Sequence, residues 1–493
     1  MRKTIFQFFH WYYPKGKLWK DVTNKASHLQ WLGITDVWLP PAYKSSAGSD
    51  GVGYDVYDLF DLGEFDQKGS IKTKYGTKNQ LINAVKTLHK HNVGVMADIV
   101  LNHKNGADEQ EKARVVKVDF NDRNKVITEP MEKEINTKYF FPGRNKKYSE
   151  FIWDYHAFTG VDECTNDGEK YIYKILNEHG ELWDDVVGEE FGNFDYLLGA
   201  DIEFRNPNVT AELKYWGKWF IETCYIDSFR LDAVKHISPK FYKEWLDYIN
   251  ETFHKKFFAI AEYWSNDLKF LLEYLDIMEN RVQLFDVPLH HNFYLASLKG
   301  KDYHLPDIFK NTLVGTRPES AITFVDNHDT QPTQALESFV DYWFKPHANA
   351  LILLRQEGIP CVFYPSYYGA SYTVNGNTID IAPVPNLYKM MMIRKHLFDG
   401  QQCDYFDHPN VISWFLSGTE ENKNAGFVLV LSNSDDGFKE MNLGGLNANR
   451  KFIDVTESFD DAVTTNDEGI AIFPVKSRNI SIWIKEEAMD KIK

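Results

Sequence analysis

Long hydrophobic runs are missing from this 493-residue chain. No stretch of about 18 consecutive apolar residues occurs, so the sequence predicts no membrane span. The first apolar stretch is short, is interrupted by Gln7 and His10, and is not followed by a small-residue cleavage site. We therefore interpret it as the first core strand and not as an export signal. The chain has four cysteines, Cys164, Cys224, Cys361 and Cys403. Their spacing is that of neither a metal nor a redox motif, which indicates reduced thiols in a cytoplasmic protein.

Basic residues are outnumbered, with 55 Lys and Arg against 71 Asp and Glu and a formal net charge of −16. This balance argues against nucleic acid as the main partner and against docking on an anionic membrane, because both need a basic surface. Aromatic residues are plentiful at 15%. Core packing accounts for most of them, and stacking on sugar rings in a binding cleft is the alternative that composition leaves open.

Short apolar segments alternate with helical patterns along most of the chain. Eight of these segments are too short for helices and are bounded by polar or turn residues, which predicts buried strands: Ile5–Phe9, Asp36–Leu39, Gly94–Ile99, Ser228–Leu231, Phe257–Ala261, Val282–Phe285, Ala321–Val325 and Ile359–Phe363. Helices fit between them, and Thr77 with Gln80 resembles a capping box that opens one of these. The pattern predicts an α/β protein with a (β/α)8 barrel.

Two segments do not follow this repeat. Residues 104–207 are too long for one crossover, and a structureless loop of that size is improbable, so we predict an inserted subdomain. Residues 398–493 alternate between apolar and polar positions with turn-rich breaks, which predicts a separate antiparallel β-sandwich. The barrel itself is then expected to comprise residues 1–103 and 208–397.

Acids follow several of the predicted barrel strands, and barrel enzymes place their chemistry at these carboxyl ends. Arg230 and Asp232 share one face of their strand, so the guanidinium can orient the carboxylate and keep it ionised. Glu262 has apolar neighbours in the sequence, and burial of that kind suits a general acid. Burying Asp232, Glu262 and Asp329 together would cost too much free energy for a role in stability alone. Asp98 is better explained as a buried ion-pair partner.

Four of these strand ends resemble the signature regions of the α-amylase family, glycoside hydrolase family 13. The likeness is strongest to its bacterial liquefying and cytoplasmic branch. It rests on Asp98–His103, on Phe229–His236, on Ala261-Glu262-Tyr263-Trp264, on Asp326-Asn327-His328-Asp329-Thr330-Gln331-Pro332, and on Tyr196–Glu203 in the inserted segment. The motifs occur in the family's order, and the resemblance covers nearly the whole chain.

The resemblance implies a role for each matching residue. Asp232 resembles the nucleophile, Glu262 the general acid/base and Asp329 the third acid, which grips sugar hydroxyls. The implied substrate-binding residues are Tyr54 as a stacking platform, His103 and His328 at the cleavage subsite, Arg230 beside the nucleophile, and Lys235 and His236 on the leaving-group side.

The resemblance also implies a calcium ion between the barrel and the inserted subdomain. Its implied ligands are Asn102, Asp195, Asp201 and the main-chain carbonyl of His236, all oxygen donors as Ca²⁺ prefers. Asp162 and Asp184 resemble further acids of a neighbouring metal cluster. The chain departs from the extracellular members at Arg205, which stands where they carry another acid and argues against a second calcium. A second departure is Ser228, where the family usually has glycine.

These features together predict an endo-acting α-amylase that hydrolyses α-1,4-glucosidic bonds in starch, glycogen or maltodextrins with retention of configuration. The expected partner is an α-glucan polysaccharide or a maltooligosaccharide, and we expect a cytoplasmic monomer. One alternative is a transglycosylating or maltogenic enzyme of the same family, which forms the same covalent intermediate. The other is a non-catalytic carbohydrate-binding barrel.

Overall fold

The computed structural model describes residues 2–163, 170–180 and 183–492. Eight strands form a closed barrel in the order β1-β16-β15-β14-β13-β12-β5-β2, which confirms the predicted (β/α)8 fold. Each lies where an apolar segment predicts it: β1 (Ile5–Gln7), β2 (Asp36–Leu39), β5 (Gly94–Ile99), β12 (Ser228–Leu231), β13 (Phe258–Ala261), β14 (Gln283–Phe285), β15 (Ala321–Phe324) and β16 (Ile359–Phe363).

Helices follow the barrel strands along the chain. They are α1 (Leu18–Trp31), α2 (Lys78–Lys90), α3 (Pro207–Cys224), α4 (Pro239–Phe253), α5 (Leu268–Met278), α6 (Val287–Lys299), α7 (Leu313–Thr316), α8 (Lys345–Leu353), α9 (Tyr364–Tyr368) and α10 (Leu387–His396). The predicted capping box is present, because the Gln80 amide donates to the Thr77 hydroxyl at 3.3 Å and the Thr77 amide donates to Gln80 Oε1 at 3.0 Å. Caps of this kind stabilise a helix by about 1 kcal/mol.

The chain forms two compact units. One comprises Tyr13–Ser27 and Val37–Phe285 and is called the 37–285 unit below. The other comprises Met1–Tyr12, His28–Asp36 and Asp286–Lys493 and is called the 286–493 unit. Each is described by itself. The boundaries of the inserted and C-terminal domains given above remain predictions.

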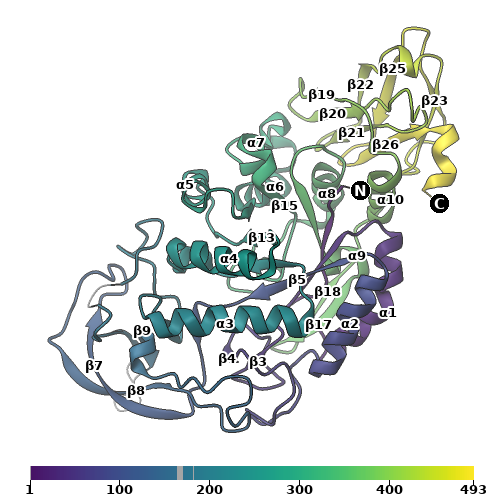
Figure 1. Cartoon of the computed structure of the whole chain (residues 1–493). Coiled ribbons are helices and arrows are strands. Elements are labelled where there is room, and N and C mark those ends of the chain that lie inside the picture. The colour runs from purple at the N-terminus through teal and green to yellow at the C-terminus, as the bar shows by residue number, and fades with distance from the viewer. Residues whose placement is uncertain (1, 164–169, 181–182, 493) are drawn as a thin grey trace. The chain divides into compact units, whose positions relative to one another are not determined.

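In the 37–285 unit, the segment predicted as an insertion forms a six-stranded sheet in the order β6-β11-β9-β10-β7-β8. Its strands are β6 (His103–Lys104), β7 (Glu109–Val118), β8 (Met131–Lys138), β9 (Phe158–Glu163), β10 (Lys170–Ile175) and β11 (Ala200–Ile202). A short pair, β3 (Lys44–Ser45) and β4 (Val56–Asp58), precedes it. Figure 1 shows α3 and α4 side by side in this unit, with the long β7 and β8 strands forming a hairpin.

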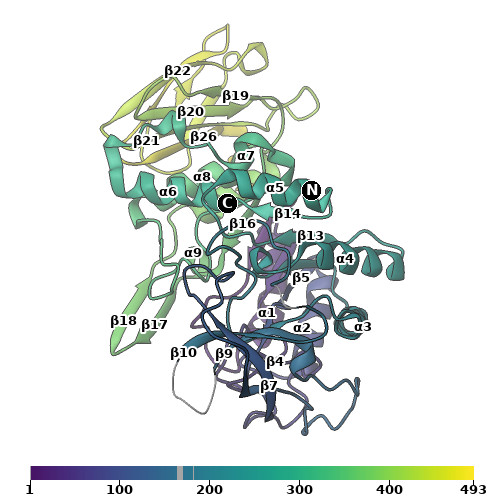
Figure 2. The ribbon, with the colours of Figure 1, turned by 90° about the vertical axis from the view of Figure 1, so that its left-hand side faces the viewer.

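The 286–493 unit ends in the predicted antiparallel strands, arranged as a six-stranded and a two-stranded sheet. They are β19 (Gln402–Tyr405), β20 (Val411–Leu416), β21 (Phe427–Ser432), β22 (Gly437–Asn442), β23 (Lys451–Asp454), β24 (Val463–Thr464), β25 (Ile470–Val475) and β26 (Ile480–Lys485). Their core contains Phe415, Phe452, Phe473 and Trp483. The hairpin β17 (Ala370–Val374) and β18 (Asn377–Ile381), clearest in Figure 2, was not predicted, although Asn375-Gly376 between alternating apolar and polar residues is a hairpin signal.

None of the helices in the described residues is both long enough and apolar enough to traverse a bilayer. Cys224, Cys361 and Cys403 are free thiols, as predicted, and Cys164 lies outside the described part of the chain.

Candidate active site

Arg230 is the centre of a buried charge cluster in the 37–285 unit. Its guanidinium is inaccessible to solvent and contacts three carboxyl groups. Arg230 Nη1 lies 2.8 Å from Asp98 Oδ1 and also bonds Asp232, while Nη2 lies 2.6 Å from Glu262 Oε2. We call these four residues the Arg230 cluster. The prediction that Arg230 pairs with Asp232 is confirmed, and so is the interpretation of Asp98 as an ion-pair partner.

Strand register explains why these side chains meet. Arg230 pairs with Asp98 across β12 and β5, and β13 lies on the other side of β12. The Asp232 amide donates to the Ile99 carbonyl at 2.9 Å and the Glu262 amide to the Leu231 carbonyl at 2.9 Å. Main-chain hydrogen bonding therefore continues one residue beyond each strand and fixes the backbone of both acids.

The backbone directly after Asp232 is strained. Ala233 has φ +49°, in the left-handed region that side chains other than glycine rarely adopt, and a 3₁₀ turn over Val234–His236 follows. Such a conformation costs of the order of 1 kcal/mol and is found mainly where function requires a particular side-chain direction. Ser228, where the family usually has glycine, is buried without interrupting the pairing of β12 with either neighbour.

Burial and the Arg230 charge act in opposite directions on the pKa values of Asp232 and Glu262. Burial raises the pKa of Asp232 to about 6, although attraction to Arg230 opposes the shift and the Asp98 charge adds to it. Burial likewise raises the pKa of Glu262, again against the attraction of Arg230. At neutral pH Asp232 is therefore ionised, and the shift of Glu262 is in the direction that a general acid needs. Glu262 is not in purely apolar company as its sequence neighbours suggested, since it touches the same guanidinium.

Tyr54 and His103 are connected to this cluster through Asp98. The Tyr54 hydroxyl donates to Asp98 Oδ2 at 2.8 Å, as does Trp38 Nε1 at 3.0 Å. His103 Nε2 donates to the Tyr54 carbonyl at 2.8 Å, and burial lowers the pKa of His103 to about 4. His103 is thus a neutral imidazole that fixes the backbone of Tyr54. Sequence reasoning missed Trp38, although its place at the end of β2 follows the same rule.

Lys235 and His236 lie on the 3₁₀ turn that follows Asp232. Lys235 bonds Glu190, and His236 Nδ1 donates to the Phe194 carbonyl at 2.7 Å. Burial lowers the pKa of His236 to about 3, so it is neutral. Both side chains therefore join the barrel turn to the segment around residues 190–194.

His328 and Asp329 belong to the 286–493 unit. His328 Nδ1 accepts from Gln7 Nε2 at 3.0 Å, and His328 Nε2 lies 3.4 Å from Asp329 Oδ2. Trp11 stacks on the His328 ring with centroids 6.2 Å apart. The side chain of Asp329 keeps 24% of its surface exposed, in contrast to the buried acids of the Arg230 cluster. Gln7 and Trp11 were not predicted, although the carboxyl end of β1 was the signal that could have found them.

The residues implied as calcium ligands lie in a second buried group, also in the 37–285 unit. Asn102 Nδ2 donates to Asp201 Oδ1 at 3.1 Å, and the Thr159 hydroxyl donates to Asp201 Oδ2. The buried oxygens Asn102 Oδ1 and Asp195 Oδ1 have no hydrogen-bond partner among the described residues. Burial, together with the charges of Asp184 and Glu203, raises the pKa of Asp195 to about 8. Buried oxygen donors with unused lone pairs are what a hard divalent cation requires, so these residues fit Ca²⁺.

Two more acids complete this group. The Asp184 amide donates to Asp195 Oδ2 at 3.0 Å, and Glu203 is fully buried. We call Asp184, Asp195, Asp201 and Glu203 the acid cluster. Arg205 binds Glu203 through two bonds, Nε to Oε1 at 2.7 Å and Nη2 to Oε2 at 2.5 Å. The predicted departure at Arg205 therefore places a fixed cation on one of these acids.

Asp162, predicted as another metal acid, is half-buried beside Tyr196, whose pKa is raised by burial first and then by Asp162. Over the described ranges, no three His, Cys, Asp or Glu side chains form a ready-made metal cluster. A calcium ion here would therefore depend on the Asn102 amide oxygen and on the main-chain oxygen of His236 as well as on acids.

A closed parallel barrel with ionisable residues beyond the carboxyl ends of its strands defines the class of barrel enzymes. The comparisons with known proteins identify the family. The alpha-amylase catalytic domain model matches residues 15–404. The chain is 48% identical to the cytoplasmic alpha-amylase of Escherichia coli, covering 99% of both, and 44% identical to the alpha-amylase of Geobacillus stearothermophilus, covering 98% of this chain and 86% of that one. The chain belongs to the α-amylase family of glycoside hydrolases.

Solved structures share this fold. An alpha-amylase from Geobacillus thermoleovorans, complexed with acarbose, has a TM-score of 0.63 at 19% identity and covers 98% of both chains. At that identity the likeness concerns the fold alone. It agrees with the barrel and the additional β domain described above.

Proposed function

We propose that this chain is an endo-acting α-amylase that cleaves α-1,4-glucosidic bonds with retention of configuration. One observation carries the proposal: the two acids expected to do the chemistry, Asp232 and Glu262, contact the two terminal nitrogens of a single guanidinium. Carboxyl groups held this close favour the spacing of retaining glycosidases, about 5–5.5 Å, over the about 6.5–9.5 Å of inverting ones.

The two acids are proposed to have different roles. In the first step, ionised Asp232 attacks the anomeric carbon while Glu262 donates its proton to the departing glycosidic oxygen. In the second step, Glu262 accepts a proton from water, and the water oxygen displaces Asp232. Arg230 holds both carboxyl groups in place throughout and limits the rise in the pKa of the nucleophile.

The remaining predicted residues are proposed to position the sugar. Asp329 would accept hydrogen bonds from sugar hydroxyls, which suits its exposed carboxylate. His103 and His328 would hydrogen-bond the sugar at the cleavage subsite, and Tyr54 would stack on it. Lys235 and His236 would lie on the leaving-group side.

Calcium is proposed as a structural ion, held by Asn102, Asp195, Asp201 and the main-chain oxygen of His236. A bound calcium ion would supply positive charge to the acid cluster and satisfy the two orphaned oxygens. The protein residues would then fix the strand pair β6 and β11, which carries His103 and Asp201 at paired positions. Asp162 and Asp184 are proposed as neighbouring acids, and Arg205 argues against a second calcium.

The names of the relatives support the substrate class. The Escherichia coli relative is a cytoplasmic alpha-amylase and the Geobacillus thermoleovorans structure holds acarbose, so we propose an α-glucan or maltooligosaccharide substrate, the cytoplasmic compartment and a monomer. A relative from Bacillus sp., 42% identical, is named a glucan 1,4-alpha-maltohexaosidase, which favours release of defined maltooligosaccharides as the second candidate activity.

Incubation with soluble starch and with maltoheptaose tests the proposal. We expect a fall in starch viscosity that outpaces reducing-sugar release, and products that first appear as α-anomers by proton NMR. Initial β-anomers would contradict retention. Products longer than maltoheptaose would identify the transglycosylating alternative, and saturable binding without reducing ends would identify the non-catalytic one.

A further inference from the structure

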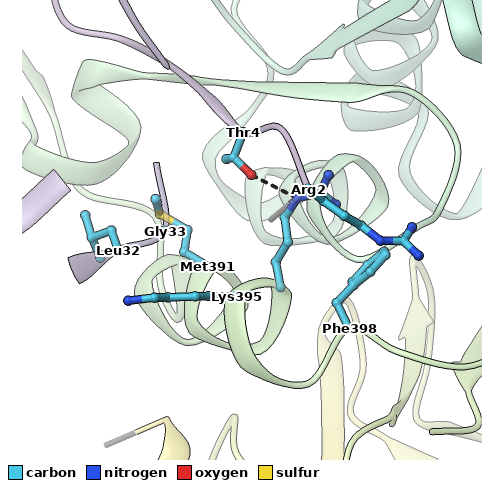
Figure 3. A pocket seen from close by; sticks show the side chains of 8 residues that line it. Arg2, Thr4, Leu32, Gly33, Met391, Lys395 and Phe398 are labelled. Atoms are coloured by element: carbon cyan, nitrogen blue, oxygen red, sulfur yellow. Dashed lines mark hydrogen bonds between the residues drawn. The ribbon is translucent and has the colours of Figure 1, made fainter. Parts of the chain in front are cut away.

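A pocket of about 360 Å³ opens beside the start of β1 in the 286–493 unit. It is lined by residues 2 and 4 before β1, residues 32 and 33 after α1, and the end of α10 with Phe398 after it (Figure 3). Figure 3 shows Leu32 and Gly33 on one side and Arg2 and Phe398 on the other. The pocket lies at the amino end of β1, whereas Trp11, His328 and Asp329 follow carboxyl ends of strands. It is therefore separate from the residues assigned to catalysis.

The charged residues that line this pocket are all cations: Arg2, Arg394 and Lys395. The Lys395 ammonium donates to the Trp31 carbonyl at 2.8 Å and so binds the end of α1. Arg394 is only 8% exposed, and three of its N–H groups donate to neutral oxygens: Thr4 Oγ1 at 3.0 Å, the Leu353 carbonyl at 2.7 Å and the Lys3 carbonyl at 3.2 Å. Within the described part of the chain, Arg394 has no carboxylate partner.

Arg2 brings a second guanidinium to the same place. Its carbon Cζ lies 4.7 Å from the centre of the Phe398 ring, and that of Arg394 lies 5.0 Å from the same centre. Arg2 is exposed and donates no hydrogen bond to any other described residue. All five of its N–H groups, and two of those of Arg394, are thus available to a ligand.

Two cations this close repel each other, and a buried cation without a counter-ion is costly. Burial, followed by the charge of Arg2, lowers the pKa of Arg394 to about 10, which reflects the same repulsion. A negatively charged ligand would remove both penalties at once. Guanidinium groups bind phosphate through paired N–H bonds, a geometry that ammonium groups do not offer.

We propose that this pocket is a binding site for a phosphate group, held by Arg2 and Arg394. The pocket volume is at the lower end of small-molecule sites, about 300–1,000 Å³. Leu32 and Met391 provide apolar surface beyond the two guanidinium groups. The site therefore accommodates either inorganic phosphate or a small phosphate monoester whose carbon skeleton rests on that surface.

Substitution of Arg2 distinguishes a phosphate-binding role of this pocket from a purely structural one. Arg394 ties the strand start to α8 through its three bonds, so its loss would disturb the fold in any case. Arg2 forms no such bond and lies outside the catalytic residues. Arg2→Gln should therefore leave starch hydrolysis and the melting temperature in buffer without phosphate unchanged.

The test is isothermal titration calorimetry of the full chain with inorganic phosphate and, separately, with glycerol 3-phosphate, at constant ionic strength and constant free calcium. Glycerol serves as the uncharged control, and Arg450→Gln, at a partly exposed arginine paired with Glu487, serves as the matched control variant. We expect one saturable site in the parent and in Arg450→Gln, at least tenfold weaker binding in Arg2→Gln, and partial recovery in Arg2→Lys.

Each outcome decides the proposal. Tighter binding of glycerol 3-phosphate than of phosphate would identify a phosphate monoester as the ligand, and equal binding would identify inorganic phosphate. Absence of saturable binding for both probes would overturn the site. Binding of equal strength in Arg2→Gln and the parent would overturn it as well, because the anion would then be bound elsewhere.

Discussion

The Arg230 cluster and the acid cluster are both buried groups of carboxyl side chains in the same compact unit, yet they are built differently. In the first, one fully buried guanidinium contacts all three acids. In the second, four acids lie together, and the Arg205 guanidinium pairs with only one of them, Glu203. The oxygens Asn102 Oδ1 and Asp195 Oδ1 are left without a hydrogen-bond partner among the described residues.

The difference shows two ways of keeping carboxylates charged away from water. A protein cation on a rigid strand fixes the position and protonation of each acid, which is what a nucleophile and a general acid need. Unbalanced acids with free lone pairs instead require a cation from solution. The first arrangement suits chemistry, and the second suits an ion that holds structure together. The predictions below test this contrast.

The largest expected effect is on turnover in the Arg230 cluster. Asp232→Asn and Glu262→Gln should each lower kcat for starch hydrolysis by at least about 10⁴-fold, since each removes a group that forms or breaks a bond. Arg230 keeps its other carboxyl partners, so the melting temperature should change little. Reducing-sugar assays and thermal unfolding would measure both, with Asp247→Asn, an exposed acid paired with Arg281, as control. Near-parental hydrolysis by either variant would refute the assignment.

The next effect concerns Arg205, the cation that pairs with Glu203 in the acid cluster. Arg205→Met leaves buried Glu203 with the main-chain amide of residue 205 but without its guanidinium partner. This loss should lower the free energy of unfolding by about 3 kcal/mol in chelator. Arg205→Lys should lose less, because it restores the charge without the paired geometry. Urea unfolding with and without calcium would show this. Parental stability of Arg205→Met in chelator would mean that the cluster does not need its internal cation.

Calcium binding itself provides the third comparison. Calcium at 100 times its Kd should stabilise the parent by about 2.7 kcal/mol. Asp195→Asn should lose this gain, and in chelator it should be at least as stable as the parent, because it replaces an acid whose ionised form is disfavoured by burial and by its acidic neighbours. Thermal unfolding against calcium concentration measures the effect, with Asp227→Asn, paired with His89 elsewhere in the unit, as control. A full calcium response in Asp195→Asn would rule out this ligand.

The smallest effect is on the pH profile. Asp232 must be ionised to attack, and its pKa is about 6, so kcat/KM should fall about tenfold for each pH unit below 6. Asp98→Asn removes a negative charge that raises the pKa of Asp232, so this acid limb should move to lower pH. Initial rates at low starch concentration would measure the shift. An acid limb that moves to higher pH would contradict the charge order within the cluster.

The sequence predicted the barrel well because its signals are local. Each buried strand is a short apolar run, and the capping box at Thr77 and Gln80 depends on neighbouring residues only. The acids at strand ends could be listed for the same reason. The β17–β18 hairpin was missed although its signal is also local, with Asn375-Gly376 between alternating apolar and polar residues.

The amino-acid sequence by itself determined the barrel strands, the family and the identity of the acids, since these depend on residue types and their order along the chain. Only the tertiary structure decided that Glu262 shares the guanidinium of Arg230, that Arg205 pairs with Glu203, and that Arg2 and Arg394 meet over Phe398. Electrostatic effects depend on distance and burial, and side chains far apart in the chain acquire both only when the chain folds.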